Sequence, residues 1–296
     1  MYYPYLRGKM NELLALKELI SKNLIDVQNV FPPIIEPIKD IPSFRNLLSV
    51  ASEKQFPLNI IVNPKVGEFS DHAVIEQLIE NNNMYRSTIM DHDTKNVNSD
   101  VKLLFYSDPQ KISFYDKSVV QVVPDSSTFR NKIALATKKD NAVIFADCFK
   151  KQERNADYVN IPVEDFSEYH LIYKSKGYIG FGDYSIIGDT YNNSGFAPYA
   201  VAIHIVYFDN ASLKIRHFVS HSNDDAKDQG NKVHEALEQF VKWYDEENIK
   251  GTLNDSFALH QLEKLYKADK NKGLGFLKRL EIMHHFELMN RYLSNN

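Results

Sequence analysis

The stretch that decides the fold runs from residue 34 to residue 62 and reads IIEPIKDIPSFRNLLSVASEKQFPLNIIV. It begins with a short apolar run, Ile34–Ile38, and ends with a second one, Leu58–Val62. Between them, residues 41–54 place apolar side chains at helical spacing, and Pro42 suits the first turn of a helix. A strand, a helix and a second strand in this order form a βαβ unit, which builds parallel sheets.

The same rhythm continues on both sides of this unit. Residues 10–21 have a helical period, and Ser70 is expected to cap a helix after the second strand. The apolar runs lack clean alternation, which is typical of strands buried on both faces of a sheet. The predicted strands are Ile34–Ile38, Leu58–Val62, Ser87–Met90, Lys102–Tyr106, Ser118–Val123, Ala142–Ala146, Tyr178–Ile187 and Tyr199–Phe208.

The spacing of these strands favours one architecture over another. Eight βα units in roughly 250 residues match the size of a (β/α)8 barrel. We therefore expect an α/β fold that is (β/α)8 barrel-like, with an added hairpin and C-terminal helices. The alternative is an open doubly wound sheet, but no glycine-rich dinucleotide fingerprint follows the first strand. A helix is expected over Val163–Ser175.

The last third of the chain changes character. Leu213–Ser220 is another strand candidate, and residues 209–212 alone separate it from Tyr199–Phe208, so the two predict an antiparallel hairpin. Beyond this hairpin the pattern is almost entirely helical. We therefore predict a barrel-like domain over residues 1–250 and a helical extension packed on it over residues 251–296.

The C-terminal helices are expected to be exposed and to provide a surface for a partner, as amphipathic helices commonly do. His284 and His285 lie in the last of them and are predicted to be surface or interface residues.

Composition excludes several classes of protein. The net charge of −4 creates no field that would draw the chain to nucleic acid or anionic lipid. The single cysteine, Cys148, allows no intramolecular disulfide and no structural zinc site built on two cysteines. The N-terminus has no signal-peptide pattern, and no apolar run approaches the roughly 18–20 residues of a membrane span. We expect a cytoplasmic protein without membrane association, and no motif identifies a cofactor.

Residues 177–223 contain more special-purpose side chains than any other segment. Gly180 and Gly182 fall at the end of a strand and permit a bulge or the close approach of backbone or ligand. Asp183 follows them, and an acid at the C-terminal end of a barrel strand is typical of a catalytic or metal-binding residue. His204 and His217 lie on the two strands of the predicted hairpin. Structural alternatives stay open: core hydrogen bonds for the histidines, and a turn cap or a pair with an arginine such as Arg216 for Asp183.

Other polar residues also fall where predicted strands end, and in a barrel they would share one rim. They are Glu36, Lys39, Asn63, Asp91, Asp147 and Asp183. Such a ring can support acid–base or Mg²⁺-dependent chemistry, although any barrel rim collects polar residues. Asp183, His204 and His217 together are also a possible ligand set for zinc or iron, but their spacing is not diagnostic.

Two parts of the chain carry a resemblance to a known family. The first consists of YLRGKMNELLAL (residues 5–16) and PIIEP (33–37). The second consists of GFGDY (180–184), AVAIH (200–204) and HFVS (217–220). Together they resemble the phage "beta protein" family over most of residues 1–245, leaving the helices after Gly251 outside the similarity. The residues that match the shared pattern are Lys9, Glu12, Glu36, Asp183, His204, His217 and Ser220.

The resemblance implies a role but no reaction. The family takes its name from a satellite-phage gene in a cassette whose members behave like a toxin and its suppressor and which protects bacteria from other phages. It thus implies an anti-phage or toxin–antitoxin-type module and a partner protein encoded in the same cassette.

The alternative is a metal-assisted or acid–base phosphodiesterase or hydrolase with its site at the barrel rim. Its predicted catalytic residues are Asp183, His204, Glu36, Lys9 and His217. Convergence of these side chains on one pocket would favour the enzyme, whereas separate core hydrogen bonds would argue against it.

Overall fold

The computed structural model describes residues 1–69, 72–112, 118–135, 141–192, 197–270 and 272–295, so the predicted cap Ser70 lies outside the described residues. The chain forms two compact units. Unit 1 consists of Met1–Asp147 and Tyr169–Tyr184, and unit 2 consists of Cys148–Glu168 and Ser185–Asn296. The sequence predicts a domain boundary after residue 250, and this position lies inside unit 2.

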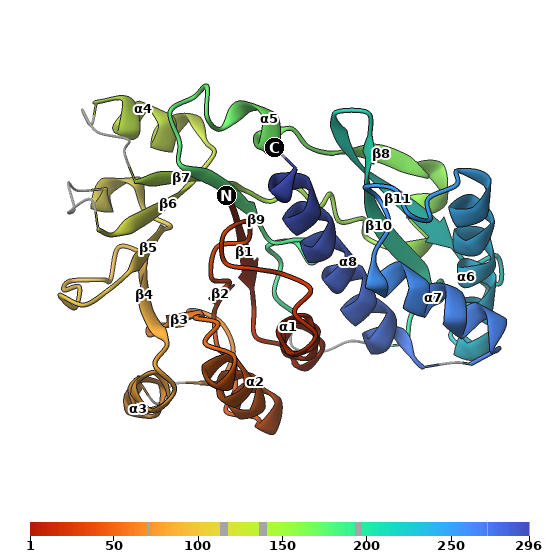
Figure 1. Ribbon diagram of the computed structural model, residues 1–296, viewed down its shortest axis with the longest axis horizontal. Coiled ribbons are helices and arrows are strands. Elements are labelled where there is room, and N and C mark those ends of the chain that lie inside the picture. Colours follow the sequence, from red (N-terminus) through yellow and green to blue (C-terminus); the bar gives the residue numbers. More distant parts are fainter. Residues whose placement is uncertain (70–71, 113–117, 136–140, 193–196, 271, 296) are drawn as a thin grey trace. The chain divides into compact units, whose positions relative to one another are not determined.

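Unit 1 is a closed barrel of parallel strands (Figure 1). The barrel closes where β9 pairs with β1, with Phe181 opposite Tyr2 and Asp183 opposite Pro4. This confirms the (β/α)8 barrel-like fold and excludes the open sheet. In barrel order the strands are β1 (Tyr2–Leu6), β2 (Ile34–Ile35), β3 (Asn59–Ile61), β4 (Tyr85–Met90), β5 (Leu103–Tyr106), β6 (Val120–Pro124), β7 (Ala142–Ala146) and β9 (Gly180–Asp183).

Seven of the eight predicted strands belong to this barrel, and one does not. The predicted strand Tyr199–Phe208 corresponds to β10, which lies in a separate sheet. Its place in the barrel is taken by β1, whose sequence YYPYL carries a proline in its middle. Proline removes a backbone donor and argues against a central strand, which explains why this segment gives no clear strand signal.

Helices connect most of the barrel strands. The helix predicted within residues 41–54 is observed as α2, and its predicted apolar face is buried. The crossover elements are α1 (Met10–Ser21), α2 (Pro42–Glu53), α3 (His72–Asn82), α4 (Ser127–Leu135), α5 (Tyr169–Ile172) and the 3₁₀ helix η1 (Pro109–Lys111).

Large side chains fill the barrel interior, and two glycines make room for them. Tyr3 on β1 and Phe145 on β7 belong to the buried interior cluster. A Cβ atom on Gly180 would lie 2.7 Å from Cδ2 of Tyr3, and one on Gly182 would lie 2.8 Å from Cδ2 of Phe145. The Gly-x-Gly spacing of β9 is therefore explained by the close approach of neighbouring strands and rings.

Unit 2 contains a three-stranded antiparallel sheet in the order β10, β11, β8. The predicted hairpin is confirmed as β10 (Ala202–Asp209) and β11 (Ser212–Val219). The predicted helix Val163–Ser175 is wrong, because its first part forms β8 (Val163–Ser167) and its second only α5. Pairing with β11 overrides the local preference of residues 163–167, as often happens for short segments.

Two helices cover opposite faces of this sheet (Figure 1). On one face, Trp243 of α6 (Gln229–Glu246) contacts Tyr207 and Phe218. On the other, Tyr292 of α8 (Leu274–Ser294) stacks on Phe208. The remaining helix, α7 (Phe257–Lys267), packs against both α6 and α8.

The predicted exposure of the last helix is wrong. Most of α8 is buried, and His284 and His285 are fully inaccessible to solvent. Their imidazoles satisfy core hydrogen bonds: Nδ1 of His284 lies 2.9 Å from the Ser256 hydroxyl, and Nδ1 of His285 lies 2.9 Å from that of Ser185. Both histidines therefore belong to the core of unit 2, where hydrogen bonds compensate the burial of their polar rings. None of the helices in the described part of the chain is both long and apolar enough to cross a membrane.

Candidate functional site at the barrel mouth

The carboxyl ends of the barrel strands bring polar residues to one rim. Arg7 follows β1, Glu36 follows β2, Asn63 follows β3 and Asp91 follows β4. In a closed parallel barrel these positions lie at the same mouth, where loops of different strands meet. Of the residues predicted at strand ends, Glu36, Asp91 and Asp147 directly follow a strand, Asn63 comes shortly after β3, and Asp183 is the last residue of β9. Lys39 lies further along the loop that follows β2.

Glu36 is the best-anchored carboxylate of this mouth. Its side chain is fully buried, and Oε2 accepts hydrogen bonds from the Tyr5 hydroxyl at 2.8 Å and from Nη1 of Arg7 at 2.5 Å. Oε1 accepts the backbone N–H groups of Lys65 at 2.6 Å and Val66 at 3.3 Å. A buried charge with four donors is compensated, so Glu36 holds neighbouring loops together at the mouth.

Arg7 is held in one orientation by this carboxylate and by two aromatic rings. Its guanidinium carbon lies 5.4 Å from the centroid of Tyr5 and 5.1 Å from that of Tyr184. Burial alone would lower the pKa of Arg7, but Tyr5 and Glu36 raise it above the ordinary value. Burial and the Glu36 carboxylate also raise the pKa of Tyr5, so both groups stay protonated at neutral pH.

Lys65 links Glu36 to a second carboxylate, Asp91. Its backbone binds Glu36, and its Nζ lies 2.6 Å from Oδ2 of Asp91. Burial opposes ionisation of Asp91, but hydrogen bonds from Lys65 and Thr94 outweigh it and lower its pKa to about 2. The mouth therefore carries a chain of charges that alternates in sign, from Arg7 through Glu36 and Lys65 to Asp91.

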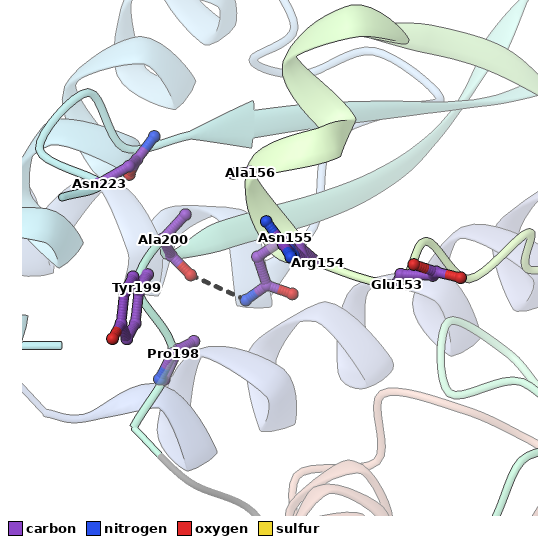
Figure 2. Close-up of a pocket in the computed structure, with 8 residues that line it drawn as sticks. All are labelled: Glu153, Arg154, Asn155, Ala156, Pro198, Tyr199, Ala200 and Asn223. Atoms are coloured by element: carbon purple, nitrogen blue, oxygen red, sulfur yellow. Dashed lines mark hydrogen bonds between the residues drawn. The ribbon is translucent and has the colours of Figure 1, made fainter. Parts of the chain in front are cut away.

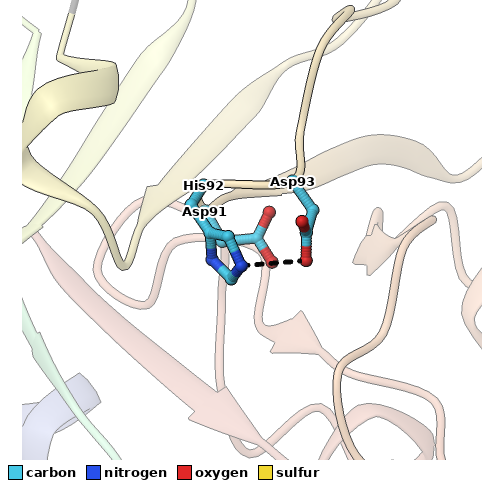
Figure 3. Close-up of side chains that lie close together, drawn as sticks. All are labelled: Asp91, His92 and Asp93. Atoms are coloured by element: carbon cyan, nitrogen blue, oxygen red, sulfur yellow. Dashed lines mark ion pairs between the residues drawn. The ribbon is translucent and has the colours of Figure 1, made fainter.

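Asp91 also begins a small group of potential metal ligands (Figure 3). Asp91, His92 and Asp93 each offer a ligand atom, and these atoms lie within 4.8 Å of one another. His92 and Asp93 are exposed and form an ion pair at 3.2 Å. Among the described residues this is the one such group, and it includes none of Asp183, His204 and His217.

Asp183 lies on the outer side of the barrel wall. The glycines of β9 point inward against Tyr3 and Phe145, and alternation along the strand turns Phe181 and Asp183 outward. Asp183 is buried there, and Oδ1 accepts a hydrogen bond from the Tyr2 hydroxyl at 2.6 Å. Its contact therefore joins β9 to β1 where the barrel closes.

His204 and His217 belong to unit 2 and face each other across the β10–β11 hairpin. Their Nδ1 atoms lie 2.7 Å apart, and Nε2 of His217 lies 3.3 Å from Oε1 of Glu164. Both rings pack against Tyr158, with centroids 4.7 and 4.5 Å from its own. The two histidines therefore belong to a buried polar network, in agreement with the alternative that they form hydrogen bonds in the core.

The five predicted catalytic residues fall in two units. Lys9, Glu36 and Asp183 belong to unit 1, and His204 and His217 belong to unit 2.

The remaining residues that match the family pattern lie near the start of α1 or at the end of β11. Lys9 is the N-cap residue that precedes α1, and its carbonyl accepts the N–H of Leu13 at 2.9 Å. Glu12 is buried in the same helix. Ser220 is buried at the end of β11, where its hydroxyl accepts the N–H of Val201 at 3.0 Å.

Three residues of the mouth were missed by the sequence analysis: Arg7, Lys65 and Tyr184. Arg7 lies two positions after Tyr5, so alternation along β1 would have placed both on the interior face. The signal was weak because β1 itself was not predicted.

Unit 2 also contains a cavity of about 580 Å³ (Figure 2). Its lining includes Pro198, Tyr199 and Ala200, which precede β10, together with Asn155 and Asn223. The Asn155 amide donates a hydrogen bond of 2.9 Å to the Ala200 carbonyl and so fixes the loop before β10.

Comparison of the chain with protein-family models, with curated proteins and with solved structures found no match. The site is therefore interpreted from its own geometry.

Proposed function

We propose that the protein acts in a bacterial or phage-borne anti-phage or toxin–antitoxin-type module, together with a protein encoded in the same cassette, and that the barrel mouth is its functional site. The resemblance of residues 5–16, 33–37, 180–184, 200–204 and 217–220 to the "beta protein" family supports the module. The single cysteine supports a cytoplasmic location, where thiols stay reduced.

One observation carries the choice of the mouth. Arg7 is fixed between Glu36, Tyr5 and Tyr184 at the end of the barrel where such folds place their sites. Its side chain is 11% exposed, so it is oriented by the protein without being completely enclosed. A planar guanidinium matches the geometry of phosphate and carboxylate groups, so we expect the mouth to bind an anionic group of its ligand or partner.

The second candidate is a metal-assisted or acid–base hydrolase at the same mouth. The Asp91, His92 and Asp93 group favours it, because carboxylate and imidazole ligands suit several divalent metals. Lys65 connects this group to Glu36, so a metal bound there would lie at the same barrel mouth as Arg7. The catalytic roles of Asp183, His204, Glu36, Lys9 and His217 stay predictions.

A plaquing assay tests the first proposal, in cells that carry the chain with its neighbouring genes. Arg7→Ala is expected to abolish protection, and Arg7→Lys to restore it only in part, because lysine lacks the planar fork. Arg45→Ala is the matched control, since Arg45 forms an exposed ion pair with Asp40 in the same unit. Full protection by folded Arg7→Ala protein would contradict the proposal.

Calorimetric titration with Mn²⁺ tests the second candidate. We expect binding to the wild type and its loss in a His92→Gln/Asp93→Asn variant, whose exposed substitutions leave the fold intact. Equal binding by both proteins would place the metal elsewhere.

A further inference from the structure

Arg216 occupies an unusual place in the sheet of unit 2. It lies on β11, and its guanidinium carbon is 5.7 Å from the ring centroid of Trp243 on α6. Its Nε is buried and has no hydrogen-bond partner among the described residues. Within that part of the chain no carboxylate forms an ion pair with it, so the pair with Asp183 considered from the sequence does not form. Buried donors in folded proteins are nearly always paired, so a water molecule or a ligand is expected to accept a hydrogen bond from this Nε.

A cavity of about 390 Å³ opens beside this arginine. It is lined by the end of β10, the hairpin turn, the C-terminal end of α6 and the loop that follows. Arg216, Trp243, Asn210, Thr252 and Glu247 are among its walls. The volume falls within the range of small-molecule sites, roughly 300–1,000 Å³.

Internal hydrogen bonds hold the rest of the cavity wall in place. The Asn254 side chain accepts the N–H of Phe208 at 2.7 Å and donates to its carbonyl at 2.9 Å. Asp209 accepts from Nζ of Lys214 at 2.7 Å, so its charge is already paired. The wall is therefore preformed, and Arg216 and Glu247 are its charged groups without an ion-pair partner among the described residues.

We propose that this cavity binds a small dipolar ligand of the amino-acid type, with its carboxylate on Arg216 and its ammonium group toward Glu247. A simple anion would be attracted by Arg216 but repelled by Glu247. A simple amine would be attracted by Glu247 but repelled by Arg216. A ligand with both charges is complementary to both walls, and the Trp243 ring offers an apolar surface for the carbons between them. This site is independent of the barrel mouth.

The protein provides its own probe for this site, because Trp243 is the single tryptophan of the chain. The full-length protein is titrated with glycine, β-alanine, γ-aminobutyrate and ε-aminocaproate while tryptophan fluorescence is recorded. Acetate and butylamine serve as probes with one charge. We expect a saturable change with at least one dipolar probe and binding about tenfold weaker, or more, with both singly charged ones.

Three variants make the test specific. Arg216→Gln is expected to abolish the saturable change, and Glu247→Gln to remove the preference for dipolar over anionic probes. Lys242→Gln is the control, since Lys242 is an exposed residue of the same helix. Circular dichroism verifies folding. If Arg216→Gln does not fold, Arg216→Lys replaces it, and weakened rather than abolished binding is then expected, because lysine keeps the charge but lacks the planar fork that pairs with a carboxylate. The proposal is overturned if neither fluorescence nor calorimetry detects saturable binding of any dipolar probe, if the arginine variant binds like the wild type, or if the preference for dipolar probes survives Glu247→Gln.

Discussion

The Nδ1 atoms of His204 and His217 lie 2.7 Å apart in the core of unit 2. At this distance one imidazole donates a hydrogen bond and the other accepts it, so only one of the two Nδ1 atoms carries a proton. Burial, with the nearby charges of Lys278 and His217, lowers the pKa of His204 well below its ordinary value. Burial also lowers the pKa of His217, although Glu164 acts in the opposite direction. The contact therefore depends on a pair that is not doubly protonated.

We predict that this pair makes unit 2 sensitive to mild acid. Unfolded histidines take up protons as the pH falls below about 6.5, whereas the folded pair resists protonation. The free energy of unfolding therefore decreases as the pH falls from that value. Glutamine at position 217 retains a donor and an acceptor for His204, so His217→Gln should show a smaller decrease in Tm between about pH 7.5 and pH 5.5. An unchanged dependence in the variant would contradict this role of the pair.

Glu281 on α8 is predicted to have the opposite pH dependence. Burial raises its pKa to about 7, although Lys278 acts against this. The Lys278 ammonium lies 3.8 Å from Oε2 of Glu281 and donates instead to the carbonyl of Ile186, so it does not offset the burial. The folded-state pKa exceeds the unfolded one, so this stabilising contribution is present below about pH 4.3 and is lost as the pH rises toward 7.

The substitution Glu281→Gln should remove that loss. The variant is expected to gain stability relative to the wild type as the pH rises from about 5 to 8, by at most roughly 3 kcal/mol. Thermal unfolding at both pH values measures the difference. Glu246→Gln is the control, because Glu246 lies exposed on α6. A constant difference between Glu281→Gln and the wild type across this range would show that Glu281 is ionised throughout.

The barrel could be predicted because its strands are short apolar runs separated by crossovers, a pattern that local sequence records well. Pro4 interrupts the strand pattern of β1, so this strand was not predicted. The antiparallel partner of β8 lies about 50 residues further along the chain, so the local sequence does not indicate their pairing. Both errors concern strands that are defined by distant partners.

The candidate site was predicted less completely for a related reason. The strand-end position of Glu36 follows from the sequence, but its four donors come from two other segments, residues 5–7 and 65–66. The outward direction of Asp183 depends on the register that turns Gly180 and Gly182 inward. The burial of His204 and His217 depends on Tyr158, which lies in a separate 3₁₀ helix, η2 (Asn155–Asn160).

The glycines of β9 should tolerate no side chain. In Gly182→Ala the new methyl group would meet the backbone oxygen of Tyr3 and the ring of Phe145, and a clash with backbone is relieved only if the strand itself shifts. We expect a loss of about 3 kcal/mol or more, or failure to fold, as found for severe overpacking. The control is Gly273→Ala, where no atom of the described residues lies within 4 Å of the added Cβ and the positive φ of 75° is the unfavourable feature. Its expected cost is about 1–2 kcal/mol, so denaturant unfolding that ranks the two variants in the reverse order would contradict the packing argument.

Arg7 and Glu36 are predicted to be coupled far more strongly than an exposed ion pair. Glu36→Gln leaves the largely buried guanidinium of Arg7 without its counter-charge, which typically costs about 3–5 kcal/mol. The double variant Arg7→Met/Glu36→Leu removes both charges and should recover part of this loss. In the control, Asp40→Asn breaks the exposed pair with Arg45 and should change stability far less. A double-mutant cycle of Arg7→Met, Glu36→Leu and their double variant measures the coupling by denaturant unfolding, and a corresponding cycle on Asp40 and Arg45 gives the coupling of the exposed pair. Coupling no larger than that of the exposed pair would mean that Glu36 does not hold Arg7 in place.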